Sequence, residues 1–264
     1  LSLGISLLYL SILLVAPLAG LALYSARIPF AEWLSILGDA RVHSAFWVSL
    51  SCAFYAALIN AVFGLIIAWS LARYAFPGKK IVDALIDLPF AIPTAVAGIA
   101  LAVLFSQNGW IGQALAPWGI QIAFSQAGIV IALVFIGLPF VVRTVQPVIL
   151  ELESEIEEAA ASLGANFGQT FIKVLWPAFA PALLTGATLA FARGLGEYAT
   201  IIFISSNIPY ETEIVPLLIV KKLLQFDYAG ASAIGLIMLV LAFVLLFGVN
   251  FGQNWLKRRT GGSA

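Results

Sequence analysis

Six long apolar runs dominate this chain and restrict what it can fold into. Each is long enough to cross a bilayer, which requires about 20 mostly apolar residues. The runs fall near residues 3–24, 46–73, 82–106, 127–149, 179–206 and 229–252. Composition agrees, because 62% of the residues are hydrophobic and 10% are charged, against about 25% charged in an ordinary soluble domain. The sequence therefore predicts an all-α, polytopic membrane protein with six transmembrane helices.

The remaining composition excludes several kinds of chemistry. The formal net charge is zero, which gives no reason to expect a nucleic-acid partner. Cys52 and His43 are the only residues of their types, so we expect no metal site, no redox chemistry and no internal disulfide. An intramembrane hydrolase is the enzyme hypothesis, but the runs contain no Ser/His or metal-ligand pair. The chain also lacks a G-x4-G-K-[ST] loop; Pro77–Lys80 is the nearest fragment. We expect no enzyme activity and no cofactor in this chain.

The basic residues beside the runs predict an orientation. Eight lie on one side, counting Arg73, Lys79, Lys80, Arg143, Lys173, Lys257, Arg258 and Arg259. Four lie on the other side, namely Arg27, Arg41, Lys221 and Lys222. Cytoplasmic loops carry the excess of Lys and Arg, so both termini are predicted to be cytoplasmic. Residues 1–41 then form the first transmembrane helix and an external loop, and 253–264 form a cytoplasmic tail.

The segment from Glu151 to Pro177 is the only sizeable acidic, polar stretch in the chain. Apolar residues recur at one helical face and glutamates crowd the first turns, which predicts a helix from near Glu151. Gly164 is a candidate C-terminal cap, and Asn166 with Gln169 has the form of a capping box. A second helix is predicted to run to Trp176 and to end at Pro177. On spacing alone, an amphipathic linker lying on the membrane surface fits equally well.

Charged residues within the runs need partners. Asp83 and Asp87 lie one turn apart near the cytoplasmic end of the third run, and Arg143 lies at a similar depth in the fourth. We expect an ion pair there, because buried charges usually pair. Arg193 and Glu197 lie deeper, four residues apart in the fifth run. They are predicted either to form an intrahelical pair or to border a gate on the translocation path.

Prolines interrupt the third and fourth runs. Pro89 and Pro93 lie in the third and Pro139 in the fourth. A proline frees a backbone carbonyl that a neighbouring helix, a side chain or water must satisfy. We therefore expect these runs to face protein or a cavity.

The polar segment resembles the EAA loop of ABC-importer permeases, whose pattern is EAA, x3, G, x9, I-x-L-P. The matching residues are Glu158, Ala159, Ala160, Gly164 and Val174-Leu175-Trp176-Pro177, preceded by Glu157. Val174 and Trp176 depart from the pattern, where the family has Ile and Leu. The resemblance implies a type I ABC-importer permease fold, with a cytoplasmic coupling helix that docks on an ATP-binding subunit.

Three further segments resemble the permeases for sulfate, thiosulfate and molybdate: residues 76–101, 137–149 and 191–209. The run at 222–239 is more similar to the T-type subunit of the sulfate/thiosulfate permease. The resemblance implies a type-1 ABC transmembrane domain over 42–252 in a bacterial inner membrane. It also implies two ATP-binding subunits that bind ATP and Mg²⁺, a second, W-type permease subunit and a periplasmic sulfate-binding protein.

Two transport alternatives remain open. Sulfate, thiosulfate, molybdate and tungstate are oxyanions of similar charge, so a molybdate or tungstate permease is one alternative. An ion-driven secondary transporter is the other, with Asp87, Arg193 and Glu197 as an ion relay.

Overall fold

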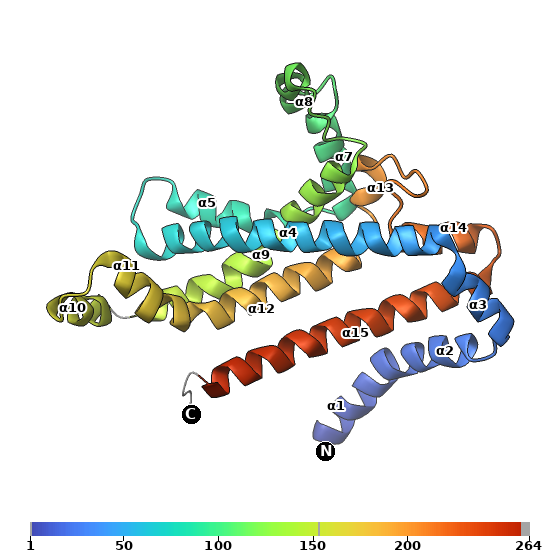
Figure 1. Cartoon of the computed structure of the whole chain (residues 1–264), viewed down its shortest axis with the longest axis horizontal. Coiled ribbons are helices and arrows are strands. Elements are labelled where there is room, and N and C mark those ends of the chain that lie inside the picture. Colours follow the sequence, from blue (N-terminus) through green and yellow to red (C-terminus); the bar gives the residue numbers. More distant parts are fainter. Residues whose placement is uncertain (1, 153, 260–264) are drawn as a thin grey trace. The chain divides into compact units, whose positions relative to one another are not determined.

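The computed structural model describes residues 2–152 and 154–259, and all regular elements in that part of the chain are helices (Figure 1). Six of them are long and apolar enough to cross a membrane, as predicted. They are Leu3–Ser25, Ala40–Arg73, Thr94–Trp118, Gln126–Glu151, Phe167–Leu195 and Tyr228–Val249. The chain divides into two compact units, residues 1–48 with 207–244 and residues 49–206 with 245–264.

The first unit begins with a span made of α1 (Ser2–Leu10), a π-helical turn η1 (Ser11–Val15) and α2 (Ala16–Ser25). None of the span's most apolar window is buried, so its side chains are suited to lipid. The short α3 (Phe30–Gly38) follows. The core of this unit joins Val42 and Ala45 of α4 (Ala40–Arg73) to Val215 and Leu218 of α14 (Val215–Leu224) and to α15 (Tyr228–Arg259).

The second unit is built around α9 (Gln126–Glu151), which packs along α12 (Trp176–Leu195) and α4. Pro139 and Pro147 lie inside α9, whose inward residues are fully buried. Small residues bring these helices close together. A Cβ on Gly186 would lie 2.8 Å from the Cα of Val141, and one on Gly64 would lie 2.7 Å from Val141 Cγ1. The prediction that the fourth span faces protein is confirmed.

The third span lies at Thr94–Trp118, later in the chain than the predicted run at 82–106, and residues 79–118 are divided into short helices. They are α5 (Lys79–Ile86), α6 (Leu88–Ala91), α7 (Thr94–Phe105), α8 (Trp110–Leu115) and the 3-10 turn η2 (Ala116–Trp118). Between α6 and α7, Ile92 is extended, with φ −87° and ψ 133°. A residue before proline avoids the helical region, so Pro93 accounts for this interruption.

The fifth span is also interrupted. Helix α12 ends at Leu195, Gly196–Thr200 is not helical, and α13 (Ile201–Ile204) continues the chain. The fifth predicted run, near 179–206, is therefore not one continuous helix. No proline lies at this break, so the sequence carries no proline signal for it.

The polar segment forms α10 (Ser154–Ser162), α11 (Phe167–Thr170) and a π-helical turn η3 (Phe171–Leu175). The capping box is confirmed: the Gln169 N–H donates to Asn166 Oδ1 at 2.9 Å, and the Asn166 N–H donates to Gln169 Oε1 at 3.0 Å. Gly164 has φ +83°, as its predicted turn requires.

Two boundaries of this segment were predicted wrongly. Glu151 is the last residue of α9, so the first polar helix begins later, at Ser154. Pro177 does not end the second helix, which runs on into α12. The Trp176 N–H donates to the carbonyl of Phe171, five residues back. This wider turn lets the helix pass through a proline.

Candidate translocation and coupling sites

The predicted pair at the fifth span is present, but it lies at the interruption. Arg193 Nη1 is 2.7 Å from Glu197 Oε2. Arg193 lies in the last turn of α12, whereas Glu197 lies beyond the end of that helix. The Glu197 carboxylate is buried, and its Oε1 accepts hydrogen bonds from the Thr200 N–H and hydroxyl, both at 2.9 Å. The pair therefore holds the non-helical turn in place as well as balancing charge.

The two interrupted spans meet at Thr200. Its hydroxyl oxygen lies 3.0 Å from the carbonyl oxygen of Thr94, at the start of α7. The hydroxyl has one proton, and both Thr94 O and Glu197 Oε1 are within reach as acceptors. The backbones are also close, because a Cβ on Gly98 would lie 2.4 Å from the Thr200 carbonyl oxygen. Discontinuous helices form substrate sites in many transporters, so this junction is the candidate translocation site.

The predicted ion pair between the third and fourth spans is also present. Arg143 binds both carboxylate oxygens of Asp87, from Nε at 2.8 Å and from Nη2 at 2.6 Å. Its Nη1 donates to Asp83 Oδ1 at 2.7 Å and to Gln146 Oε1 at 2.9 Å. The side chains are one third to one half exposed. With so many donors engaged, Arg143 fixes α5 against α9 and is not available as a substrate ligand.

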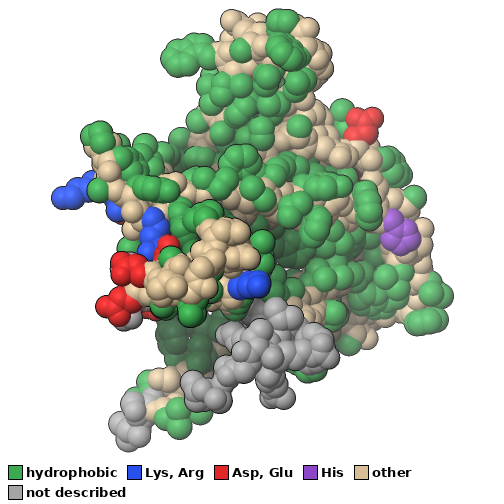
Figure 2. Space-filling model, turned by 60° about the vertical axis from the view of Figure 1, so that its left-hand side comes forward, with side chains coloured by type: hydrophobic (Ala, Val, Ile, Leu, Met, Phe, Trp, Pro, Cys, Tyr) green, Lys and Arg blue, Asp and Glu red, His purple; other side chains and the backbone are tan. Residues whose placement is uncertain are grey.

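The polar segment formed by α10, α11 and η3 exposes large apolar side chains. Leu163 is 88% exposed and Phe167 is 75% exposed, on either side of the Gly164 turn. Glu158 is exposed too. Exposed large apolar groups beside an acidic helix are typical of a contact surface. Figure 2 shows charged side chains gathered on the end of the second unit that carries α5 and α10. Glu157, predicted with the coupling residues, points instead to Arg73, at 2.7 Å.

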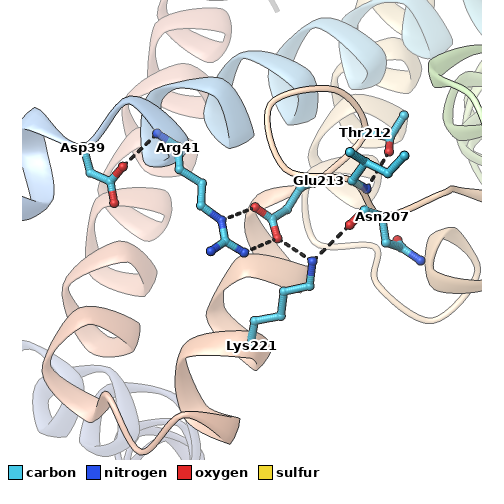
Figure 3. Close-up of polar contacts among 7 residues, drawn as sticks. Asp39, Arg41, Asn207, Thr212, Glu213 and Lys221 are labelled. Carbon is cyan, nitrogen blue, oxygen red and sulfur yellow. Dashed lines mark hydrogen bonds and ion pairs between the residues drawn. The ribbon is translucent and has the colours of Figure 1, made fainter.

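A charged cluster in the first unit was not predicted from the sequence (Figure 3). Glu213 is fully buried and receives Arg41 Nε and Nη2, both at 2.7 Å, and Lys221 Nζ at 2.6 Å. Lys221 also donates to the carbonyl oxygen of Asn207, at 3.0 Å. Burial alone would raise the pKa of the Glu213 carboxyl, but the hydrogen bonds from Arg41 and Lys221 hold that pKa below its usual value. This cluster fixes the loop before α14.

An apolar cavity of about 610 Å³ in the second unit does not fit an oxyanion. Its walls come from α4, α12 and the second half of α15, and Thr188 supplies the only hydroxyl in the lining. Anion sites need charged or polar donors. Within the described residues no group of three or more metal-ligating side chains occurs.

Six apolar helices, two interrupted spans that meet inside the protein, and an exposed acidic helix between spans four and five are typical of a polytopic membrane transport protein. The chain belongs to the family of binding-protein-dependent transport system inner membrane components, which matches residues 60–262.

Curated relatives match nearly the whole chain. It is 47% identical over 262 residues to the sulfate transport system permease protein CysT of Escherichia coli K12, covering 99% of this chain and 95% of the relative. It is 48% identical over 253 residues to the CysT protein of Synechococcus elongatus, covering 96% and 91%. The predicted membership in the sulfate permease group is confirmed by these matches.

Solved structures confirm the predicted fold. A chain of a bacterial ABC transporter involved in alginate import superposes with a TM-score of 0.79 at 18% identity, covering 96% of this chain and 93% of that one. The alginate transporter in complex with a pentasaccharide-bound periplasmic protein gives a TM-score of 0.78 at 19% identity, covering 100% and 94%. The fold is therefore that of an ABC-importer permease.

Proposed function

We propose that this chain is a permease subunit of an ATP-driven importer, which moves sulfate or thiosulfate from a periplasmic binding protein into the cytoplasm. The observation that carries the proposal is the 47% identity to a sulfate permease over almost the full length of both proteins. In this proposal two separate ATP-binding subunits hydrolyse ATP with Mg²⁺, and a second, W-type permease subunit completes the membrane path. Both termini and α10 face the cytoplasm.

The test is reconstitution of the complex in liposomes. We expect radiolabelled sulfate to accumulate only when ATP, the ATP-binding subunits and the binding protein are all present. Molybdate or tungstate uptake without sulfate uptake would establish the other oxyanion assignment. Uptake driven by an ion gradient without the ATP-binding subunits would refute the proposal in favour of a secondary transporter.

Residues 151–177 are proposed to couple ATP hydrolysis to transport, with Glu158, Ala159 and Ala160 on the docking helix and Gly164 at its turn. Pro177 would then direct the chain back into the membrane. The exposed Leu163 and Phe167 support this role, since a surface of this kind needs a partner. The helix pair also joins directly to α12, so a displacement of α11 would reach the fifth span.

Gly164 allows a controlled test of coupling. Its φ of +83° strains any residue with a Cβ, at about 1–2 kcal/mol. Gly164→Ala should therefore reduce association with the ATP-binding subunits. Gly168→Ala is the matched control, because its φ is ordinary and its nearest contact would be at 3.5 Å. Equal association and uptake in the two variants would remove the turn from the coupling mechanism.

Arg193 and Glu197 are proposed to act at a gate bordering the anion path. Their place at the interruption of the fifth span supports this, because the turn is where the path can open. The pair does not favour a tight permanent anion site, because Glu197 partly neutralises the attraction of Arg193 for a dianion. In the double variant Arg193→Met/Glu197→Gln, the substituted amide oxygen can still accept from Thr200. Assembly with lost or uncoupled transport would support the gate; wild-type uptake would mean that the pair is structural.

A further inference from the structure

Among the described residues, one ion pair connects the side of α10 to the end of the membrane-spanning helix α4. Arg73, the last residue of α4, places Nη2 2.7 Å from Glu157 Oε1 in α10. Both side chains are mostly buried, at 22% and 33% exposure. Neither of these two atoms has an aligned hydrogen bond, and Arg73 Nε has none either. The attraction of the buried guanidinium is therefore directed at this one carboxylate.

Arg73 is itself held by an aromatic cluster at the base of the fifth span. Its guanidinium lies 5.4 Å from the ring centre of Trp69, one turn back in α4. The Trp69 ring packs edge-on against Phe171 of η3 at 6.1 Å and Phe179 of α12 at 6.2 Å. Glu157, Arg73 and Trp69 thus connect α10 to α4 and, through the rings, to α12. This cation–π contact attracts the guanidinium to the face of the Trp69 ring.

Within the part of the chain that the structure describes, the C-terminal end of α10 has no comparable contact to limit its rotation. The helix ends at the Gly164 turn, whose glycine has nothing within 4 Å of a Cβ position. A helix followed by such a turn can pivot unless a lateral contact holds it. Without the ion pair to Arg73, Glu157 and the residues after it, Glu158, Ala159 and Ala160, would be free to reorient on the surface of a partner.

We propose that Arg73 and Glu157 are positioning residues that anchor the coupling helix, so that a displacement of α10 moves the end of α4. This inference rests on the proposed coupling role of 151–177. Glu157 then faces inward and does not contact the ATP-binding subunit, which reverses the role expected from its place beside Glu158. The contact surface is left to the exposed side of α10 and the turn.

The test uses the complete complex in liposomes, with ATP hydrolysis and sulfate uptake measured together. Arg73→Gln and Glu157→Gln should each keep association with the ATP-binding subunits and keep ATP hydrolysis, while sulfate moved per ATP hydrolysed falls several-fold. The exchanged pair Arg73→Glu/Glu157→Arg should recover most of that ratio. Glu155→Gln, an exposed position on the same helix, is the matched control and should behave as wild type.

A second measurement does not depend on the exchanged pair adopting the right geometry. Arg73→Cys and Glu157→Cys, in a Cys52→Ala background, are joined with a short bifunctional thiol reagent. Joining should raise the sulfate-to-ATP ratio above that of the unjoined variant, because the anchor is restored covalently.

Three results would overturn the anchor. The first is an unchanged ratio in both Gln variants. The second is loss of subunit association in Glu157→Gln but not in Arg73→Gln, which would make Glu157 a direct contact. The third is no recovery in either the exchanged or the joined pair. All three leave the importer itself intact, whereas a wild-type complex without ATP-dependent sulfate uptake would contradict the proposed function.

Discussion

Adding one methyl group at Gly98 tests the junction of the two interrupted spans. A Cβ there would lie 2.4 Å from the Thr200 carbonyl oxygen, 2.8 Å from its Cα and 3.0 Å from its carbonyl carbon. Since carbon contacts settle at roughly 3.5 Å or more, the backbones must separate by about 1 Å. All three contacted atoms belong to the Thr200 backbone, so a change of side-chain rotamer cannot relieve the clash. Overpacking of this kind costs about 1–3 kcal/mol.

Helix propensity acts in the opposite direction and must be subtracted. Alanine is more favourable than glycine in a helix by about 1 kcal/mol. Gly235→Ala in α15 isolates that gain, because its nearest contact would be Ile219 Cδ1 at 4.0 Å. We expect Gly98→Ala to be less stable than Gly235→Ala by about 1–3 kcal/mol, which corresponds to a melting temperature lower by about 2–12 °C in a chain of this size.

Cys52 provides the assay. It is the only cysteine and is 2% exposed, so a thiol-reactive dye reports unfolding of the detergent-solubilised protein on heating. If the melting temperature of Gly98→Ala equals or exceeds that of Gly235→Ala, the two spans do not approach each other as closely as described. Lower stability together with reduced uptake would tie the junction to transport.

Three further outcomes are expected. Arg143→Met should lower stability by about 1 kcal/mol, given its partial exposure, and adding Asp87→Asn should cost little more; additive losses would mean that the two do not interact. Glu213 has a lowered pKa in the folded protein, so its stabilisation is complete above its ordinary pKa of about 4.3 and is lost as pH falls through the lowered folded pKa. The stability difference from Glu213→Gln, measured by thermal melts across that range, should therefore shrink on acidification; a constant difference would contradict the pairing. In intact cells, with Cys52 replaced by alanine, a membrane-impermeant thiol reagent should label Glu211→Cys but not Lys80→Cys, and the reverse pattern would refute the orientation together with the coupling assignment.

Local signals in the sequence predicted much of this fold. The six spans follow from apolar length, and the Asn166 cap follows from residue types three positions apart. The Arg143 pair was predictable because the cost of a charge in a membrane leaves few alternatives, and two carboxylates lay at the same depth. In each case the deciding interaction is either local or enforced by the bilayer.

Other features had no comparable signal. Glu213 and Arg41 are 172 residues apart, and nothing near either one indicates the other. The interruption at Gly196–Thr200 depends on the carboxylate of Glu197 binding its own turn, which a hydropathy pattern cannot register. Glu157 looked like part of a solvent-facing acidic run, and its inward direction depends on where α4 ends. Tertiary contacts decide all three.

The first span and the fourth differ in how much sequence change each can absorb. In Leu3–Ser25 no residue of the apolar window is buried, so many different apolar side chains would serve at these positions. In α9, where Val141 meets two glycines from neighbouring helices, a single methylene changes the fit. A library randomised over apolar residues in both spans should therefore return functional transporters with a varied first helix and an almost unvaried fourth.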